Sequence, residues 1–207
     1  MHAEDRHGAA LGEAFARAIA SLDESGVAYA LIGGLAVAHH GLPRATRDVD
    51  ILLHGSRIAL LDLLERFRAN RFEFDARRVL EELCDDHLSE VRYRGIRVDL
   101  LDAVVPVFVR FVERARIVEM RELDATRELD ATREVGARDG PSLRIVRPED
   151  LITLKLIAGR ARDRQDVRAV LAAQRGRLDL DAIREDVRES CDAQTLEMFE
   201  RLVAETT

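Results

Sequence analysis

The segment 30–53 constrains the fold more than any other part of this chain of 207 residues. In it an apolar run ends in a Gly-Gly pair, a short helical segment and a loop follow, and Asp48 and Asp50 then alternate with apolar residues. Side chains at positions i and i+2 of a strand point to the same side, so the two aspartates project from one face. The pattern predicts two carboxylates side by side on a rigid strand, an arrangement that suits a divalent cation.

The composition is that of a soluble globular protein, long enough for one good core or for a catalytic core with a small second lobe. No apolar run approaches the roughly 20 residues that span a bilayer, and no signal-like N-terminus is present. The two cysteines, Cys84 and Cys191, cannot form a disulfide framework. We therefore expect a cytoplasmic protein with no membrane partner.

Charge limits the partners that the whole protein attracts. The net charge is -7, so any binding of nucleic acid must rest on local patches. Among the 32 basic residues Lys155 is the single lysine. Either that position needs a compact ammonium group, or one lysine fell there by chance, and both explanations stay open.

Alternating strand and helix patterns predict the fold class. Strands are expected at 27–32, 48–54, 72–74, 88–93, 96–101, 116–120 and 143–146. Helices are expected at 9–25, 35–40, 58–67 with Ser56 as its N-cap, 79–84, 106–114, 148–158, 167–171, 180–190 and 193–204. This order indicates an α/β or α+β protein with a small C-terminal helical lobe.

A six-residue repeat, Arg-Glu-Leu-Asp-Ala-Thr, occupies 121–126 and recurs at 127–132. Its period matches neither a heptad nor a solenoid repeat. We interpret it as a duplicated segment that lengthens an exposed hairpin or loop, and we expect the strand after it to pair with the strand before it. The expected domains are a core at 1–120, an insertion at 121–147 and a helical lobe at 148–207.

A third acidic residue, Asp99, lies within an apolar strand, where a carboxylate is costly to bury unless it has a partner. Acidic residues two positions apart are common in a chain of this composition, so the pair alone indicates little. The neighbouring glycine pair and Asp99 are what mark Asp48 and Asp50 as candidate site residues. A glycine pair after a strand lets backbone N–H groups approach a triphosphate closely. Carboxylate oxygens fit Mg²⁺ bridging that triphosphate.

These motifs resemble those of the nucleotidyltransferases of the DNA polymerase β superfamily, and more closely those of the AbiEii-like group, the toxin components of some toxin–antitoxin systems. The core motifs are Ile32-Gly33-Gly34-Leu35-Ala36, Arg44-Ala45-Thr46-Arg47-Asp48-Val49-Asp50 and Arg97-Val98-Asp99-Leu100-Leu101. The C-terminal signature runs from Pro148-Glu149-Asp150-Leu151 through Lys155 to Arg162, Asp163 and Asp166. The resemblance covers roughly half the chain in separated blocks and implies a mixed sheet flanked by helices.

The resemblance implies the roles of the site residues. Asp48, Asp50 and Asp99 would be catalytic and would ligate Mg²⁺ (or Mn²⁺), and Asp99 would also orient or deprotonate the attacking hydroxyl. The residues expected to bind the nucleotide are Gly33, Gly34, Arg44, Thr46, Arg47, Lys155 and Arg162. The helical lobe would complete this nucleotide site.

Some alternatives remain open at this point. Arg44 and Arg47 would contact the nucleotide or only pair with local carboxylates. Asp163 and Asp166 would orient Lys155 or Arg162, although a solvated helix start is the preferred interpretation. His39 and His40 follow each other on a helix and point in different directions, so a role at the helix end is favoured over a metal pair.

The resulting functional hypothesis is a Mg²⁺-dependent enzyme that transfers an NMP from an NTP to an acceptor hydroxyl. The acceptor, an RNA 3′ end such as that of tRNA, a protein or a small molecule, is left open, and the scarcity of aromatic residues argues mildly against a large nucleic-acid footprint. A cognate antitoxin is a further expected partner. The alternative is a catalytically silent nucleotide- or partner-binding module, which the presence of all three aspartates disfavours.

Overall fold

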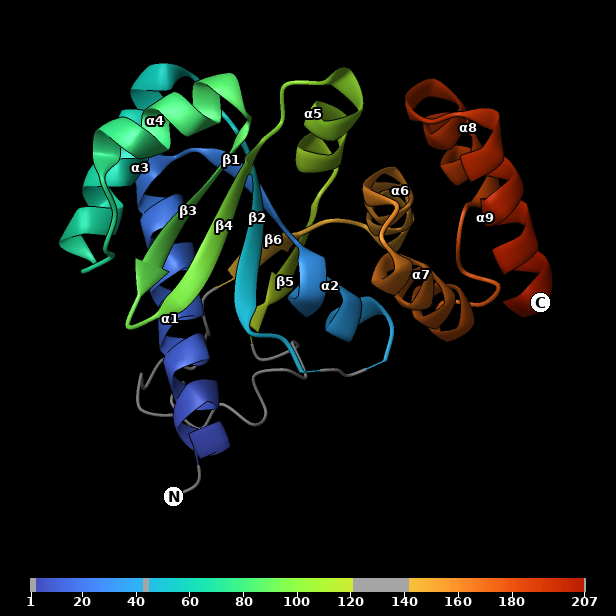
Figure 1. Cartoon of the computed structure of the whole chain (residues 1–207), viewed down its shortest axis with the longest axis horizontal. Coiled ribbons are helices and arrows are strands. Elements are labelled where there is room, and N and C mark those ends of the chain that lie inside the picture. Colours follow the sequence, from blue (N-terminus) through green and yellow to red (C-terminus); the bar gives the residue numbers. More distant parts are fainter. Residues whose placement is uncertain (1–2, 43–44, 121–141, 207) are drawn as a thin grey trace.

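The computed structural model describes residues 3–42, 45–120 and 142–206, and it forms a mixed sheet flanked by helices (Figure 1). The strands are β1 (Ala28–Ile32), β2 (Asp48–His54), β3 (Leu88–Tyr93), β4 (Ile96–Asp102), β5 (Arg116–Glu119) and β6 (Ser142–Ile145). The helices are α1 (Ala3–Ser25), α2 (Gly33–His40), α3 (Arg57–Ala69), α4 (Ala76–Asp85), α5 (Pro106–Glu113), α6 (Pro148–Ala158), α7 (Ala161–Ala173), α8 (Leu180–Ser190) and α9 (Ala193–Thr206). The predicted α/β fold class is confirmed.

The six strands lie in the order β3-β4-β2-β1-β6-β5. β2 runs parallel to β4 and antiparallel to β1, while β1 runs parallel to β6. β3 and β4 form the predicted hairpin, and β5 pairs with β6 across the repeat, as expected. The two central strands, β2 and β1, therefore have partners on both sides.

Alternation along β2 and β4 separates a core face from a polar face. Val49, Ile51, Val98 and Leu100 are fully buried, whereas the aspartates between them are only partly buried. α1 runs along the sheet behind these strands and packs against α3 (Figure 1). The helices α6 to α9 stand together on the side of the molecule opposite α3 and α4, so the predicted helical lobe is present.

Several local signals act as expected. Ser56 accepts a hydrogen bond from the backbone N–H of Ala59 and caps α3. Pro148 begins α6, and Gly159 ends it in the left-handed conformation, with φ 66°. Proline at the first helical position and glycine after the last thus set both ends of the helix that carries Lys155.

Other boundaries differ from the expectation for identifiable reasons. Residues 72–74 do not form a strand: Glu73 makes one isolated bridge with Arg92, and Asp75 immediately caps α4 by accepting from the N–H of Arg78. α1 begins at Ala3, earlier than expected. α2 begins directly at Gly33, before the expected start.

The six-residue repeat, 121–132, lies outside the described residues, and so does most of the predicted insertion at 121–147. The last strand of that insertion, β6, pairs with β1 in the main sheet. The domain boundaries stay a prediction. Both cysteines are free, and no helix in the described residues combines the length and apolar character needed to cross a membrane.

Candidate active site

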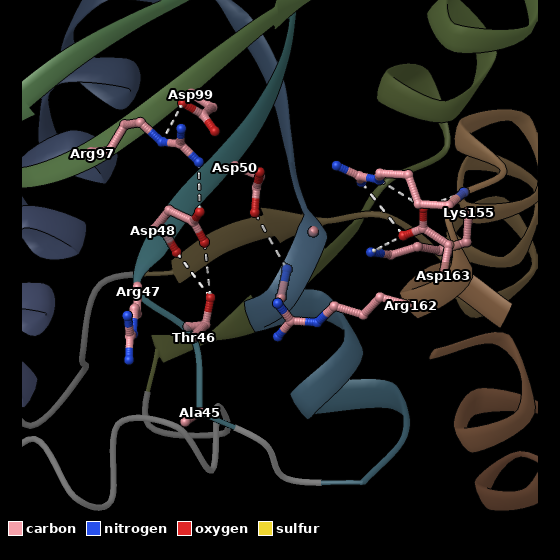
Figure 2. A pocket seen from close by; sticks show the side chains of 13 residues that line it. Ala45, Thr46, Arg47, Asp48, Asp50, Arg97, Asp99, Lys155, Arg162 and Asp163 are labelled. Carbon is pink, nitrogen blue, oxygen red and sulfur yellow. Dashed lines mark hydrogen bonds and ion pairs between the residues drawn. The ribbon is translucent and has the colours of Figure 1, made fainter. Parts of the chain in front are cut away.

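The three predicted catalytic aspartates come together because of the parallel pairing of β2 and β4. In this register Asp50 lies opposite Asp99, and Asp48 lies opposite Arg97. Asp48 and Asp50 share a face of β2 because they are two residues apart. Figure 2 shows the aspartate triad (Asp48, Asp50 and Asp99) gathered on these neighbouring strands at one wall of a pocket.

The glycine pair starts α2 directly against this triad. Gly33 has a φ of 64°, a left-handed conformation that favours glycine, and a Cβ atom there would lie 1.9 Å from Oδ2 of Asp50. The backbone N–H of Gly34 donates to the same oxygen at 3.3 Å. The pair therefore allows Asp50 to approach the first turn of α2, whose amide groups carry partial positive charge.

Arg97 lies between two members of the triad. Its Nη2 is 2.8 Å from Oδ2 of Asp48, and its Nε is 3.1 Å from Oδ1 of Asp99. The hydrogen bond to Asp48 raises the pKa of Arg97 above its ordinary value. Arg97 was not among the predicted site residues, although its spacing of two residues from Asp99 in a strand predicts that both share a face.

The triad has an excess of negative charge in a partly dry setting. Burial raises the pKa of Asp99 to about 6; Arg97 opposes this shift, and the charges of Asp50 and Asp48 add to it. Burial, followed by the charge of Asp48, also raises the pKa of Asp50. A carboxyl group with a pKa near the working pH accepts a proton more readily than an ordinary aspartate.

The loop before β2 supplies the next residues of the pocket (Figure 2). The hydroxyl of Thr46 donates to Oδ1 of Asp48 at 3.1 Å and so helps to fix that carboxylate. Arg47 is exposed and lines the pocket. Arg44 lies outside the described residues, so its predicted role stays a prediction.

The opposite wall carries a lysine cluster (Lys155, Asp163 and Asp166). Nζ of Lys155 on α6 lies 3.0 Å from Oδ1 of Asp163 and 2.9 Å from Oδ2 of Asp166, both on α7. All three side chains are nearly inaccessible, with exposed fractions of 9%, 3% and 5%. The preferred interpretation of Asp163 and Asp166 as a solvated helix start is therefore wrong, whereas their alternative role of orienting Lys155 agrees with the geometry.

Burial alone would lower the pKa of Lys155, but the hydrogen bonds that its ammonium donates to Asp166 and Asp163 outweigh burial and raise the pKa above the ordinary value. Burial would likewise raise the pKa of Asp163, yet its bonds with Arg160 and Lys155 lower it. Asp163 also accepts from the backbone N–H of Arg160 at 3.1 Å and so caps α7. This cap explains why α7 begins at Ala161, inside a polar run that we did not expect to be helical.

The pocket between these walls has a volume of about 330 Å³. It brings together every predicted site residue that the structure describes, together with Arg97 and Arg160, which the prediction did not include. Its lining is Gly33, Gly34, Ala45, Thr46, Arg47, Asp48, Asp50, Arg97, Asp99, Lys155, Arg160, Arg162 and Asp163.

The histidine pair lies at the end of α2 and does not line the pocket. His40 is buried, its Nε2 lies 2.7 Å from the carbonyl oxygen of Val146, and burial lowers its pKa to about 4. A neutral ring bonded to the backbone is consistent with the favoured role at the helix end.

The triad offers oxygen ligands that fit Mg²⁺ or Mn²⁺, and the missing side chain of Gly33 leaves Asp50 room beside α2. Within the part of the chain that the structure describes, no group of three or more His, Cys, Asp or Glu side chains is already arranged around a common metal position. Arg97 gives a physical reason, because its guanidinium engages oxygens of both Asp48 and Asp99. Arg97 thus occupies one oxygen of Asp48 and one of Asp99 that would otherwise face a cation.

A mixed sheet that carries three aspartates beside a helix starting with Gly-Gly has the arrangement of a nucleotidyltransferase, and this enzyme class agrees with the resemblance drawn from the sequence. A family model described as the nucleotidyl transferase AbiEii toxin of a type IV toxin–antitoxin system matches residues 15–206. The chain belongs to this family.

A comparison with solved structures gave a match to the crystal structure of an antigenic nucleotidyltransferase-like protein from Paracoccidioides brasiliensis. The sequences are 14% identical, the alignment covers 90% of this chain and 92% of that chain, and the TM-score is 0.40. No curated protein matched the sequence.

Proposed function

We propose that this protein transfers a nucleoside monophosphate from an NTP to the hydroxyl of an acceptor, with release of pyrophosphate, and that the reaction depends on Mg²⁺ or Mn²⁺. The observation that carries the proposal is the register of β2 and β4, which places Asp50 opposite Asp99 and next to a helix that begins with two glycines. Membership of a nucleotidyltransferase family supports it.

Asp48, Asp50 and Asp99 are the residues that would hold the metal. When bound, the metal would supply positive charge that offsets the charge of the triphosphate and of the leaving pyrophosphate. The hydroxyl of Thr46 keeps Asp48 oriented, and the N–H of Gly34 does the same for Asp50.

The other walls of the pocket suit the triphosphate. Arg47 and Arg162 are exposed at its edge, and we assign them to the phosphates together with the amides of Gly33 and Gly34. Lys155 is held in one position by Asp163 and Asp166, so it presents a fixed ammonium at the wall rather than a flexible arm. Arg44 is predicted to join this set.

The transfer exchanges one bond at phosphorus for another. The acceptor oxygen forms a bond to the α-phosphorus, the bond from that phosphorus to the oxygen bridging to the β-phosphate breaks, and pyrophosphate leaves. The proton of the hydroxyl passes to the carboxylate of Asp99, which lies beside Asp50 on the neighbouring strand.

The test is label transfer from each α-labelled NTP, with Mg²⁺ or Mn²⁺, to total tRNA, to aminoglycosides and to the protein itself. We expect Asp50→Ala to abolish transfer, whereas Asp85→Ala, which removes an exposed carboxylate at the end of α4, should transfer label at the normal rate. Transfer that survives Asp50→Ala would contradict the site. Nucleotide binding with no labelled acceptor of any kind would instead favour the silent binding module.

The family model describes toxins, and we propose the same role for this chain, with an antitoxin as its partner. Production of the protein in a bacterial host should arrest growth, and Asp50→Ala should restore growth at an equal protein level. Arrest by both proteins would separate toxicity from the proposed chemistry.

A further inference from the structure

A second cavity, of about 450 Å³, adjoins the candidate active site. The two cavities share Gly33, Asp50, Asp99, Lys155 and Arg160. Every residue that lines only the second cavity is apolar. Its volume lies in the usual range of small-molecule sites, so it can hold a bulky chemical group beside the triad.

The apolar wall is built from separate elements that the core holds in place. Ile32 ends β1, Leu101 lies on β4, Phe108 on α5, and Leu154 on α6, and all four pack against the buried core while remaining partly exposed. Leu88, at the start of β3, is half exposed. Apolar side chains left open around one concave surface are typical of a binding site.

The cavity begins at the residue that we assign to the acceptor hydroxyl. Asp99 and Leu101 are two residues apart on β4, so they share a face, and the apolar wall continues directly from the carboxylate. An acceptor with its hydroxyl at Asp99 would therefore place the next part of its structure against Leu101 and Phe108.

The lining argues against the nucleotide as the occupant. The ribose hydroxyls and the polar edges of a base would find no partner along the apolar part of this cavity, where every side chain is a hydrocarbon, and unpaired polar groups are costly to bury. The triphosphate has a better match in the first cavity, where Arg47 and Arg162 are exposed.

The lining of the second cavity also argues against an RNA acceptor. The phosphate backbone of RNA binds to cationic side chains that are free to pair with it. Among the described residues, the cationic ones that line the second cavity are Lys155 and Arg160, and both already form ion pairs with Asp163. An uncharged acceptor with an apolar body fits this charge pattern better.

We propose that the second cavity is the acceptor site and that the acceptor hydroxyl is the phenol of a tyrosine side chain in a protein substrate. The inference rests on the proposed nucleotidyl transfer. The ring would pack against Phe108 and the aliphatic wall, since aromatic rings pair edge to face or offset. The phenolic oxygen forms the new bond to the α-phosphorus, pyrophosphate leaves, and the phenolic proton passes to Asp99.

The first experiment measures binding without catalysis. N-acetyl-tyrosinamide is titrated into protein with ¹³C-labelled Ile and Leu methyl groups, and the NMR shifts of Ile32, Leu154 and Ile157 are followed. We expect saturable shifts that N-acetyl-serinamide does not produce. Ile58, which is 79% exposed on α3 and does not line the cavity, is the internal control and should not shift.

Absence of specific shifts with the tyrosine compound would overturn the proposal. So would adenosine shifting the same methyl groups at lower concentration, because the cavity would then be the base site. Both results concern binding alone, so neither depends on whether the transfer reaction occurs.

The second experiment compares acceptors in the label-transfer assay. A tyrosine peptide should be labelled at least about tenfold faster than the same peptide with serine or an oligoribonucleotide 3′ end, a difference of about 1.4 kcal/mol. Phe108→Ala should raise the KM for the peptide about tenfold, since an aromatic pair contributes on this scale, while the KM for the NTP changes little. Ile58→Ala truncates an exposed apolar side chain that does not line the cavity, and it is the control.

Preferred labelling of RNA or serine, or a Phe108→Ala effect on the NTP instead of the peptide, would overturn the tyrosine assignment and leave nucleotidyl transfer standing. If no acceptor is labelled and no metal-dependent NTP binding is found, nucleotidyl transfer itself fails. The methyl shifts then decide by themselves whether the cavity binds a phenol.

Discussion

Two acidic groups lie on opposite sides of the same pocket, and they differ in how their charge is balanced. The aspartate triad lines one wall, and Lys155 and Asp163 of the lysine cluster line the other (Figure 2). The aspartate triad is paired with Arg97, whose side chain is 44% exposed. The lysine cluster is paired internally through Lys155, whose side chain is 9% exposed. Both groups are thus built from aspartates. The counter-ion of the triad can move into solvent, whereas the counter-ion of the lysine cluster is enclosed.

The pKa values of the two groups are shifted in ways that reflect this difference in charge balance. Burial raises the pKa of Asp50 and Asp99, so the triad is charged only at a cost. In the lysine cluster the pKa of Asp163 is lowered and that of Lys155 is raised, because each has an opposite charge within hydrogen-bond distance. The triad is thus short of positive charge, as expected for a cation site, whereas each carboxylate of the lysine cluster has a buried ammonium beside it.

Among variants that keep all three aspartates, the largest expected effect comes from disturbing the triad through Gly33. In Gly33→Ala the new Cβ would fall on Oδ2 of Asp50, which must move, and a displacement of this size at a reacting centre can cost about a hundredfold in rate. Label transfer measures it. Gly176→Ala is the matched control, since Gly176 also has a positive φ, of 73°, but nothing lies within 4 Å of the added Cβ. Equal activity losses in both variants would contradict a specific role of Gly33.

Breaking the lysine cluster should lower the free energy of unfolding, and this loss is expected to be the primary effect. Lys155→Met removes the buried ammonium that both Asp163 and Asp166 contact, which should lower the free energy of unfolding by roughly 3 kcal/mol. Urea unfolding measures the loss. Arg164→Met removes an exposed positive charge from α7 and should have little effect.

Adding Asp163→Asn and Asp166→Asn to Lys155→Met should recover part of the lost stability, because the two buried negative charges are then removed together with the ammonium. If Lys155→Met weakens NTP binding but leaves unfolding unchanged, the lysine is a phosphate ligand rather than a structural counter-ion.

Removing the counter-ion of the triad should favour the metal. Arg97→Gln deletes a positive charge that competes for Asp48 and Asp99, so Mn²⁺ should bind about tenfold more tightly in the absence of nucleotide. Titration followed by electron paramagnetic resonance measures the affinity. Arg92→Gln, on the neighbouring strand and paired with Glu90, makes the same change in net charge and is the control. Equal or weaker Mn²⁺ binding in Arg97→Gln would show that Arg97 does not compete with the metal.

The smallest expected effect is a pH dependence of stability that belongs to the lysine cluster. The lowered pKa of Asp163 contributes stability above its unfolded value of 3.8, and this is lost as the pH falls through the folded pKa. The raised pKa of Lys155 contributes stability below its unfolded value of 10.5, and this is lost as the pH rises through the folded pKa.

The free energy of unfolding of the wild type should therefore fall more steeply toward both pH extremes than that of the triple variant with Lys155→Met, Asp163→Asn and Asp166→Asn. Urea unfolding at about pH 3, 7 and 11 makes the comparison. Parallel pH profiles would mean that the cluster does not link its charges to folding.

Local patterns accounted for much of the fold. The ladder of β2, the hairpin of β3 and β4 and the cap at Ser56 depend on alternation, turn residues and capping groups that are close in sequence. The sequence is a poorer guide to α3: the helical spacing of its apolar residues puts Ile58 and Leu61 on one face with Leu64 and Phe67, but Ile58 and Leu61 are exposed. Tertiary contacts decide which side of a helix is covered, so periodicity alone leaves this open.

The sequence by itself determined the fold class, the family and the aspartates worth testing, because strand alternation and a glycine pair followed by Asp-x-Asp are local patterns. Tertiary structure decided how their charges are balanced. The pairing of Arg97 with Asp48 depends on the register between β2 and β4. The burial of Asp163 and the apolar cavity beside Asp99 depend on how helices from distant parts of the chain pack. Burial and pairing across elements have no signature in residue spacing, and they set the electrostatics of this site.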